Sequence, residues 1–310
     1  MCVYVCVCGG GGLNLLGIHM DYVCVNICIH TNTHTQHLHL HTQTQRDTWP
    51  GVEHTGQSHG LRCGGGTIRY LYAVGGEVGQ VCPDDDEDYM GYLAASPTAW
   101  RHELALQEWV KVTNLRRFRS MAAACAFDGR CVVAGGFDND HATTPAVERH
   151  NPQLDKWEPM GRLVLARDSF SLVVVDQQML AIGGWDHKHR LVADVERYDA
   201  SLDRWNIDSS TPMSVPRGGM AVAQHMGLVY AAGGFDTDAC VTKVVEAYDV
   251  LEGSWTAMPD LQTARAMCAA LSTNGALYVT GGLDPATGEV FPSFFLSFSS
   301  TAFLALFLFL

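Results

Sequence analysis

A pair of glycines recurs after a short apolar run at nearly constant intervals, and this period constrains the fold more than any other feature. The pairs are Gly75–Gly76, Gly135–Gly136, Gly183–Gly184, Gly233–Gly234 and Gly281–Gly282. The first glycines of the last four pairs lie 48, 50 and 48 residues apart. A fixed period of about 20–50 residues is typical of chains that repeat one small structural unit.

Charged and aromatic residues recur in the same register as the glycines. An arginine lies sixteen residues before the first glycine of each of the last four pairs. In three of these repeats a glutamate lies thirteen residues after the first glycine, and a tryptophan lies nine residues after that glutamate. The members are Arg119, Arg167, Arg217 and Arg265; Glu148, Glu196 and Glu246; and Trp157, Trp205 and Trp255. Tyr198 and Tyr248 follow two of the glutamates by two residues. This combined spacing indicates one repeating unit.

The double glycine, the Glu-x-Tyr pair and the downstream tryptophan resemble the kelch repeat over about residues 68–285. The resemblance implies an all-β fold, a kelch-type β-propeller of four-stranded antiparallel blades, with about four to five blades present. In the best repeat we predict strands over 169–175, 178–184, 193–199 and 204–208, with Asp176 and Gln177 as a tight turn. We expect the glycines to lie where backbones crowd, the aromatic residues to fill the gaps between blades, and the arginine and glutamate to hydrogen-bond between adjacent blades.

The repeat register fails at both ends of this region, so we predict an incomplete ring. His59 stands where the first repeat needs its arginine, and Phe294 stands where the last repeat needs its glutamate. We expect neither terminal segment to close the ring, which leaves open edges for an oligomer or for aggregation. The acidic run Asp84–Asp88 in the first repeat is predicted to lie in a solvated loop.

The two ends of the chain differ in composition from the middle. Residues 1–66 alternate Val with Cys and then Thr with His, as translated dinucleotide repeats do, and we interpret them as low-complexity, disordered or mistranslated. The alternative is a metal-binding tract through its histidines, for which the segment offers no fixed geometry. Residues 289–310 form an apolar tail, of which 291–310 suits either a membrane anchor or an artefact of translation. The predicted propeller domain is therefore 67–288.

Charge and cysteine usage narrow the function and the compartment. The formal net charge of −13 argues against a nucleic-acid partner, which requires clustered Lys and Arg. The eleven cysteines show no framework of paired spacing and favour a reducing, cytoplasmic compartment over a secreted one. The alternative is a protein anchored in a membrane by its tail.

Candidate binding residues follow from the resemblance to kelch proteins that act as substrate adaptors of ubiquitin ligases. In such proteins a partner peptide docks on one mouth of the ring, on loops after the double glycine and after the repeat arginine. The implied residues are Phe137, Asp138, Asn139, Trp185, Asp186, His187, Phe235, Asp236, Thr237 and Asp284 in the first set, and Ser120, Met121, Asp168, Ser169 and Met267 in the second. The four aspartates predict either an acidic ring for a basic partner segment or an Asx-turn in each loop.

The sequence therefore predicts a protein-binding module, with a ubiquitin-ligase adaptor as its finer form. Such adaptors carry a BTB or F-box domain, which residues 1–66 do not resemble, and no residue here argues for the actin binding known in the family. The alternative is a propeller enzyme of the copper oxidase or sugar isomerase type, for which His141, His187 and His189 are the candidate cluster. No nucleophile is paired with a base, so we expect no catalytic residues, no metal and no cofactor.

Overall fold

The computed structural model describes residues 2–8, 13–15, 18–28, 62–63, 66–67, 70–79, 93–103, 108–208, 212–238, 240–273, 276–284 and 289–290. Every regular element in these ranges is a β-strand. The prediction of an all-β propeller is confirmed by three separate four-stranded antiparallel sheets, which form the second, third and fourth blades. The acidic run Asp84–Asp88 and the apolar tail 291–310 lie outside the described residues.

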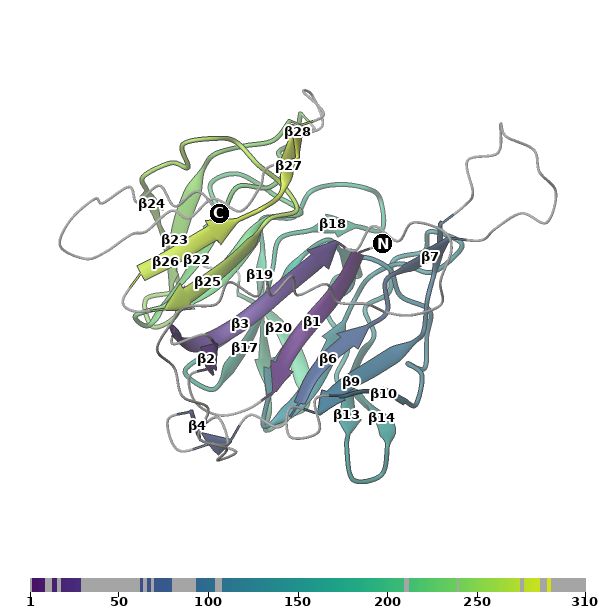
Figure 1. Cartoon of the computed structure of the whole chain (residues 1–310). Coiled ribbons are helices and arrows are strands. Elements are labelled where there is room, and N and C mark those ends of the chain that lie inside the picture. The colour runs from purple at the N-terminus through teal and green to yellow at the C-terminus, as the bar shows by residue number, and fades with distance from the viewer. Residues whose placement is uncertain are drawn as a thin grey trace.

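In each complete blade the four strands pair in chain order (Figure 1). The second blade contains β11 (Ala123–Phe127), β12 (Arg130–Ala134), β13 (Val147–Asn151) and β14 (Lys156–Met160); the third contains β16 (Ser171–Val175), β17 (Gln178–Ile182), β19 (Val195–Asp199) and β20 (Arg204–Asp208); and the fourth contains β21 (Ala221–His225), β22 (Leu228–Ala232), β23 (Val245–Asp249) and β24 (Ser254–Met258). The four strands predicted in the third blade are confirmed. Asp176 and Gln177 have φ angles of 46° and 63°, which is the twist that a two-residue hairpin turn requires.

The first and fifth blades belong to one eight-stranded sheet, and here the structure differs from the expectation of an unclosed ring. The strand order is β10 (Glu108–Val112), β9 (Ala99–Glu103), β6 (Tyr70–Val74), β1 (Cys2–Cys8), β3 (Ile18–Cys28), β25 (Ala269–Thr273) and β26 (Ala276–Thr280), with β2 (Leu13–Leu15) paired to β3. Figure 1 shows the purple β1 and β3 between the blue β6 and the yellow-green β25. The Val–Cys alternation that we interpreted as low-complexity has the β-branched content of a strand, which explains this pairing. Oligomerisation through open edges stays a prediction, as do the domain boundaries.

The remaining strands are short ladders near the ends of the blades. They are β4 (Arg62–Cys63) with β5 (Gly66–Thr67), β7 (Glu77–Gly79) with β8 (Leu93–Ala95), β15 (Arg167–Asp168) with β18 (Trp185–Asp186), and β27 (Leu283–Asp284) with β28 (Glu289–Val290). Three of these ladders contain a strand that directly follows a paired glycine, namely β7, β18 and β27. They therefore position the loops in which the candidate site lies.

The hydrophobic core lies between neighbouring blades. Trp157 of the second blade packs in one cluster with Tyr72 of the first, and Trp205 of the third blade packs with Val132 of the second. In the third cluster Tyr248 of the fourth blade packs with Ile182 of the third. Because each blade buries both faces in this way, its inner strands are apolar on both sides rather than alternating.

A buried ion pair recurs inside each complete blade. Arg167 donates to the Glu196 carboxylate at 2.6 Å and to the carbonyl oxygen of Gly183 at 2.9 Å, and both charged side chains are fully buried. Glu196 in turn accepts the backbone N–H of Val164, at 2.6 Å, and of Leu165, at 3.0 Å. Arg119–Glu148 and Arg217–Glu246 repeat this arrangement at 2.8 and 2.6 Å. We expected these pairs to bridge adjacent blades; instead each one fixes the segment entering a blade to the third strand of that same blade.

The paired glycines permit a close approach of neighbouring blades. Gly135 has a φ of 62°, and a Cβ on it would collide with the carbonyl oxygen of Arg167 from the next repeat. The same carbonyl accepts the N–H of Gly136 at 2.9 Å. The bond recurs from Gly76 to Arg119, from Gly184 to Arg217 and from Gly234 to Arg265, each at 2.8 Å. One backbone hydrogen bond therefore joins each of these four pairs of successive repeats.

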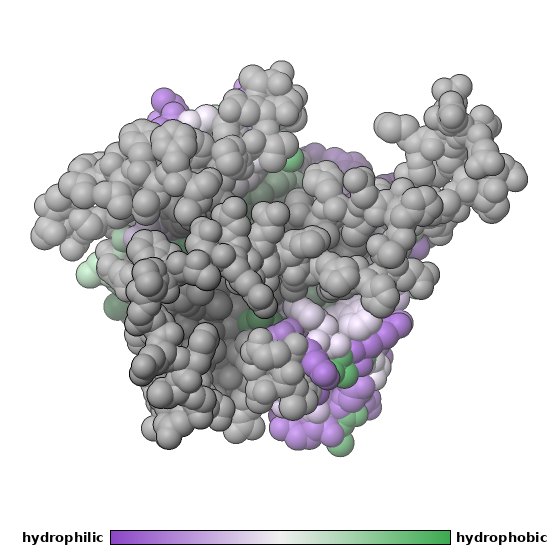
Figure 2. Space-filling model, viewed as in Figure 1, coloured by the Kyte–Doolittle hydropathy of each residue, from purple (hydrophilic) through white to green (hydrophobic). Residues whose placement is uncertain are grey.

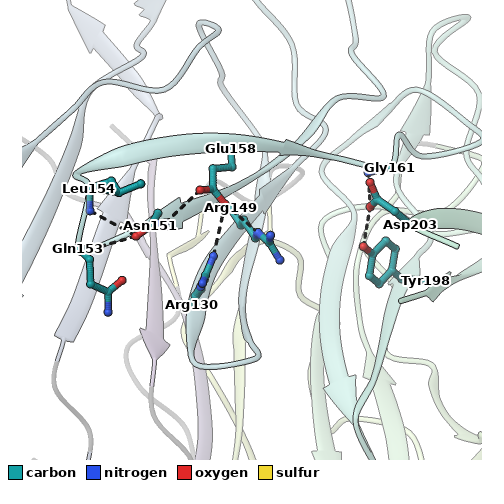
Figure 3. Close-up of polar contacts among 9 residues, drawn as sticks. All are labelled: Arg130, Arg149, Asn151, Gln153, Leu154, Glu158, Gly161, Tyr198 and Asp203. Atoms are coloured by element: carbon teal, nitrogen blue, oxygen red, sulfur yellow. Dashed lines mark hydrogen bonds and ion pairs between the residues drawn. The ribbon is translucent and has the colours of Figure 1, made fainter. Parts of the chain in front are cut away.

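Polar contacts at the outer edge also connect the second blade to the third (Figure 3). Asp203 accepts the N–H of Gly161 at 2.7 Å and the hydroxyl of Tyr198 at 2.6 Å. Within the second blade, Glu158 accepts from Arg130 and Arg149, each at 3.3 Å. On the face seen in Figure 2, the described surface over β13 and β14 is mainly hydrophilic with isolated hydrophobic residues.

Candidate functional site

The two sets of predicted binding residues are adjacent in each repeat, although they are far apart in sequence. Ser120 forms a β-bridge with Phe137, and the ladder of β15 with β18 places Asp168 opposite Trp185. In the next repeat Gly218 bridges Phe235. The loops after the glycines and the residues after the arginines therefore form one continuous surface, which we call the mouth.

A chain of backbone hydrogen bonds runs from repeat to repeat across the mouth. The residues two after each arginine, Met121, Ser169, Gly219 and Met267, have φ angles of 50°, 50°, 63° and 52°. The N–H of Ser169 donates to the carbonyl of Met121 at 2.9 Å, that of Gly219 to Ser169 at 2.8 Å, and that of Met267 to Gly219 at 2.7 Å. We call these four residues the belt. Their left-handed backbone directs a carbonyl and an N–H along the ring, so the belt fixes the position of each repeat at the mouth.

Three of the four predicted aspartates bind the backbone of their own loops. Asp138 accepts the N–H groups of residues 140 and 142 at 3.0 and 3.1 Å. Asp236 accepts those of residues 238 and 240 at the same distances. Asp186 accepts those of residues 188 and 190, together with the Arg190 guanidinium at 2.7 Å. Burial alone would raise the pKa of Asp186, but the hydrogen bonds from Arg190 and Lys188 outweigh burial and lower it to about 2. This geometry supports the Asx-turn interpretation in three loops.

An apolar patch packs over the backbone of Gly218 and Gly219. The rings of Trp185 and Phe235, from successive repeats, are 5.8 Å apart. A Cβ on Gly218 would collide with the Trp185 ring, and a Cβ on Gly219 would lie 3.2 Å from the sulfur of Met267 and 3.3 Å from Phe235. Trp185, Phe235 and Met267 thus surround backbone that carries no side chain, and each of the three is only partly buried. We call these five residues the aromatic patch.

A buried carboxyl lies beside this patch. Asp168 is 8% exposed, and its carboxylate accepts the Ser169 hydroxyl at 3.0 Å. Burial raises the pKa of Asp168 to about 6, although the Ser169 hydrogen bond and the nearby His189 act in the opposite direction. In the preceding repeat Ser120 occupies the same register and donates to Glu77 at 2.7 Å. Sequence reasoning missed Glu77, which directly follows the first glycine pair just as Phe137 and Trp185 follow theirs.

Comparison with known proteins agrees with this geometry. The family described as "Kelch motif" matches residues 119–163, 166–211 and 216–262. The chain carries kelch repeats. It is 35% identical over 72 residues to the mouse protein "Influenza virus NS1A-binding protein homolog", a match covering 23% of this chain and 11% of that protein. The solved chain "Structure of YjhT" superposes with a TM-score of 0.62 at 16% identity, over 75% of this chain and 79% of that one, which shows the shared fold.

Of the other predicted residues of this mouth, three lie in loops and one lies in a strand. Asn139, His187 and Thr237 are exposed. Asp284 lies in β27, opposite Glu289. The histidines of the copper alternative do not meet in a site: within the described ranges, no group of three or more His, Cys, Asp or Glu side chains is placed to hold a metal ion. His141 instead packs against Phe137, with ring centroids 5.5 Å apart.

Proposed function

We propose that this kelch propeller binds a segment of a protein partner at its mouth, with the aromatic patch as the apolar anchor point. The proposal rests mainly on one observation: Trp185, Phe235 and Met267 are partly exposed around Gly218 and Gly219. Aromatic side chains at the centre of a surface dominate binding energies in protein interfaces, and the Trp185 ring packs directly on the bare backbone of Gly218, which holds it in place for a partner. The acidic loops around the patch support a basic residue in the same segment, because Asp138 and Asp236 add negative charge.

The test begins with selection of short random peptides on the purified full-length chain. Affinities of the selected peptides are then measured for the wild type, for Trp185→Ala and Phe235→Ala, and for the control Leu251→Ala. Leu251 is 88% exposed in the turn between β23 and β24, so its removal takes away a large apolar side chain outside the mouth. We expect each mouth variant to lose about 30-fold in affinity, as hot-spot residues do, and the control to lose almost none. Selected peptides that bind all four proteins equally would refute the proposal.

The finer form of this proposal is a substrate adaptor of a ubiquitin ligase. It is supported by the resemblance of the repeat to adaptor propellers, and it requires the full-length chain to co-purify with a cullin-type ligase. The chain spans a small part of the mouse relative it matches, so the activity of that protein is not transferred here. We also propose that the chain has no catalytic activity; stoichiometric copper binding by the purified propeller would contradict this.

The proposed compartment is the cytoplasm, and the thiols support it. Cys125, Cys131 and Cys268 are buried in the hydrophobic clusters between blades. Burial raises the pKa of Cys268 to about 11, which leaves it as an unreactive apolar group. In the part of the chain that the structure describes, no helix has the length and apolar character to cross a membrane. Oxidation-state analysis of the full-length chain in cells tests the compartment.

A further inference from the structure

A cavity of about 330 Å³ with a basic wall lies beside the segment that joins β10 to β11. Four arginines line it: Arg116, Arg117 and Arg119 from that segment, and Arg162 just after β14. Its volume falls within the range of about 300–1,000 Å³ typical of ligand-binding pockets. In a chain with a net charge of −13, so many arginines around one cavity need a physical explanation.

The charge of this cavity is not balanced by the protein. Glu148 is the one acid in its lining, and both of its oxygens have donors: Arg119 donates to Oε1 at 2.8 Å, and the backbone N–H of Arg116 donates to Oε2 at 3.1 Å. Arg116, Arg117 and Arg162 are exposed. Among the described residues, no Asp or Glu forms an ion pair with any of these three side chains. The cavity therefore presents about three uncompensated positive charges.

The blade does not require arginine at these positions. In the next repeat Val164 and Leu165 stand in place of Arg116 and Arg117, and the following repeat has Ser214 and Val215. The backbone N–H donates to the repeat glutamate in every case, from Arg116, from Val164 and from Ser214, at 3.1, 2.6 and 3.0 Å. Since the structural bond comes from the backbone, the side chain is free to vary. The two arginines are therefore available for a ligand.

We propose that this cavity binds a phosphorylated side chain of a partner polypeptide. A phosphate dianion carries about two negative charges and three acceptor oxygens, so it can accept from several guanidinium groups at once, whereas one carboxylate is satisfied by one bidentate arginine. Phe118 lies between two of the lining arginines in the sequence and is 49% exposed. This exposed ring offers apolar contact to the residues that flank the phosphate, which favours a polypeptide over free phosphate.

The experiment uses the purified full-length chain and three short probe peptides of alanine and glycine with one central residue: phosphoserine, glutamate or serine. Inorganic phosphate is the fourth probe. Binding is measured by calorimetry at two salt concentrations for the wild type, Arg116→Ala, Arg117→Ala, Arg162→Ala and the control Arg204→Ala. Arg204 is an exposed arginine of β20 outside the cavity, so it matches the loss of one surface charge. Urea unfolding of each variant separates loss of binding from loss of the fold.

We expect the phosphoserine peptide to bind more tightly than the other probes, and each cavity variant to weaken it by about tenfold while Arg204→Ala does not. Affinity for the phosphoserine peptide should fall with salt less steeply in the cavity variants than in the wild type. Equal binding of the phosphoserine and serine peptides refutes the proposal, as does phosphopeptide binding that survives all three cavity substitutions. Equal affinities for inorganic phosphate and the phosphopeptide refute the polypeptide as ligand. Trp185→Ala should leave this binding unchanged, so failure here and failure of the mouth proposal are distinguishable.

Discussion

The buried pair of Arg167 and Glu196 allows a sharp test of what holds a blade together. We consider Glu196→Ala, which removes the carboxylate and keeps the arginine. Three hydrogen bonds to Glu196 are then lost: one from the Arg167 guanidinium and two from the N–H groups of Val164 and Leu165. Burial already lowers the pKa of Arg167, because desolvation disfavours its charged form, and Glu196 is the first of the groups that oppose this shift.

The expected cost is about 3–5 kcal/mol of unfolding free energy, the magnitude found when one partner of a buried ion pair is removed. Glu196→Gln keeps the shape and an acceptor oxygen but loses the charge, so we expect it to cost about 1.5–3 kcal/mol. The matched control is Glu158→Ala. Glu158 pairs with Arg130 and Arg149 at the surface, where solvent screening leaves such pairs with little effect on stability.

The assay is urea unfolding monitored by tryptophan fluorescence. The free energies of unfolding are compared with one m-value, the slope of free energy against urea concentration, for all variants. The order of stability should be Glu158→Ala, Glu196→Gln and then Glu196→Ala, from most to least stable. If Glu196→Ala cost no more than Glu158→Ala, the pair would contribute nothing beyond a surface contact. The reasoning from burial would then be refuted.

The other predictions concern the glycines and the buried acid of the mouth. Gly135→Ala and Gly129→Ala introduce the same strain, since their φ angles are 62° and 68°, but only a Cβ at Gly135 meets the Arg167 carbonyl. In the urea assay we expect Gly129→Ala to cost about 1–2 kcal/mol and Gly135→Ala clearly more, so equal costs would contradict the close approach. Asp168 has a folded pKa of about 6, raised by burial from 3.8, so its contribution to stability is full below pH 4 and is lost as the pH rises through 6. Stability of the wild type relative to Asp168→Asn should therefore fall by about 3 kcal/mol between pH 4 and pH 7.5, and a flat difference would contradict the burial argument.

The repeat pattern predicted the blade fold because its residues act locally and in fixed register. The strands of the third blade followed from apolar runs and from the turn at Asp176–Gln177, whose φ angles are both positive. The role of Trp205 between blades followed from spacing alone. Closure of the ring did not follow, because pairing of β1 with β6 and of β3 with β25 is non-local, and the Val–Cys alternation has no counterpart in the repeat.

Prediction of the candidate site was weaker than prediction of the fold. The mouth residues could be named from resemblance, yet the roles of the aspartates depended on loop geometry, which decided for Asx-turns at Asp138, Asp186 and Asp236. The basic cavity could not be predicted, because Arg116 and Arg162 are 46 residues apart in the sequence and meet only through the fold. Comparison of Arg116 with Val164 in the repeat register was the one available signal.

The belt has a consequence for how such proteins can diverge. Met121, Ser169, Gly219 and Met267 bond to one another through main-chain atoms alone, so substitutions of their side chains leave those bonds in place. The four equivalent positions already hold methionine, serine and glycine. At Met121, Ser169 and Met267, which already carry a side chain in this backbone conformation, substitutions can change what the surface recognises while the main-chain bonds beneath stay the same; a side chain at Gly219 would meet Met267 and Phe235.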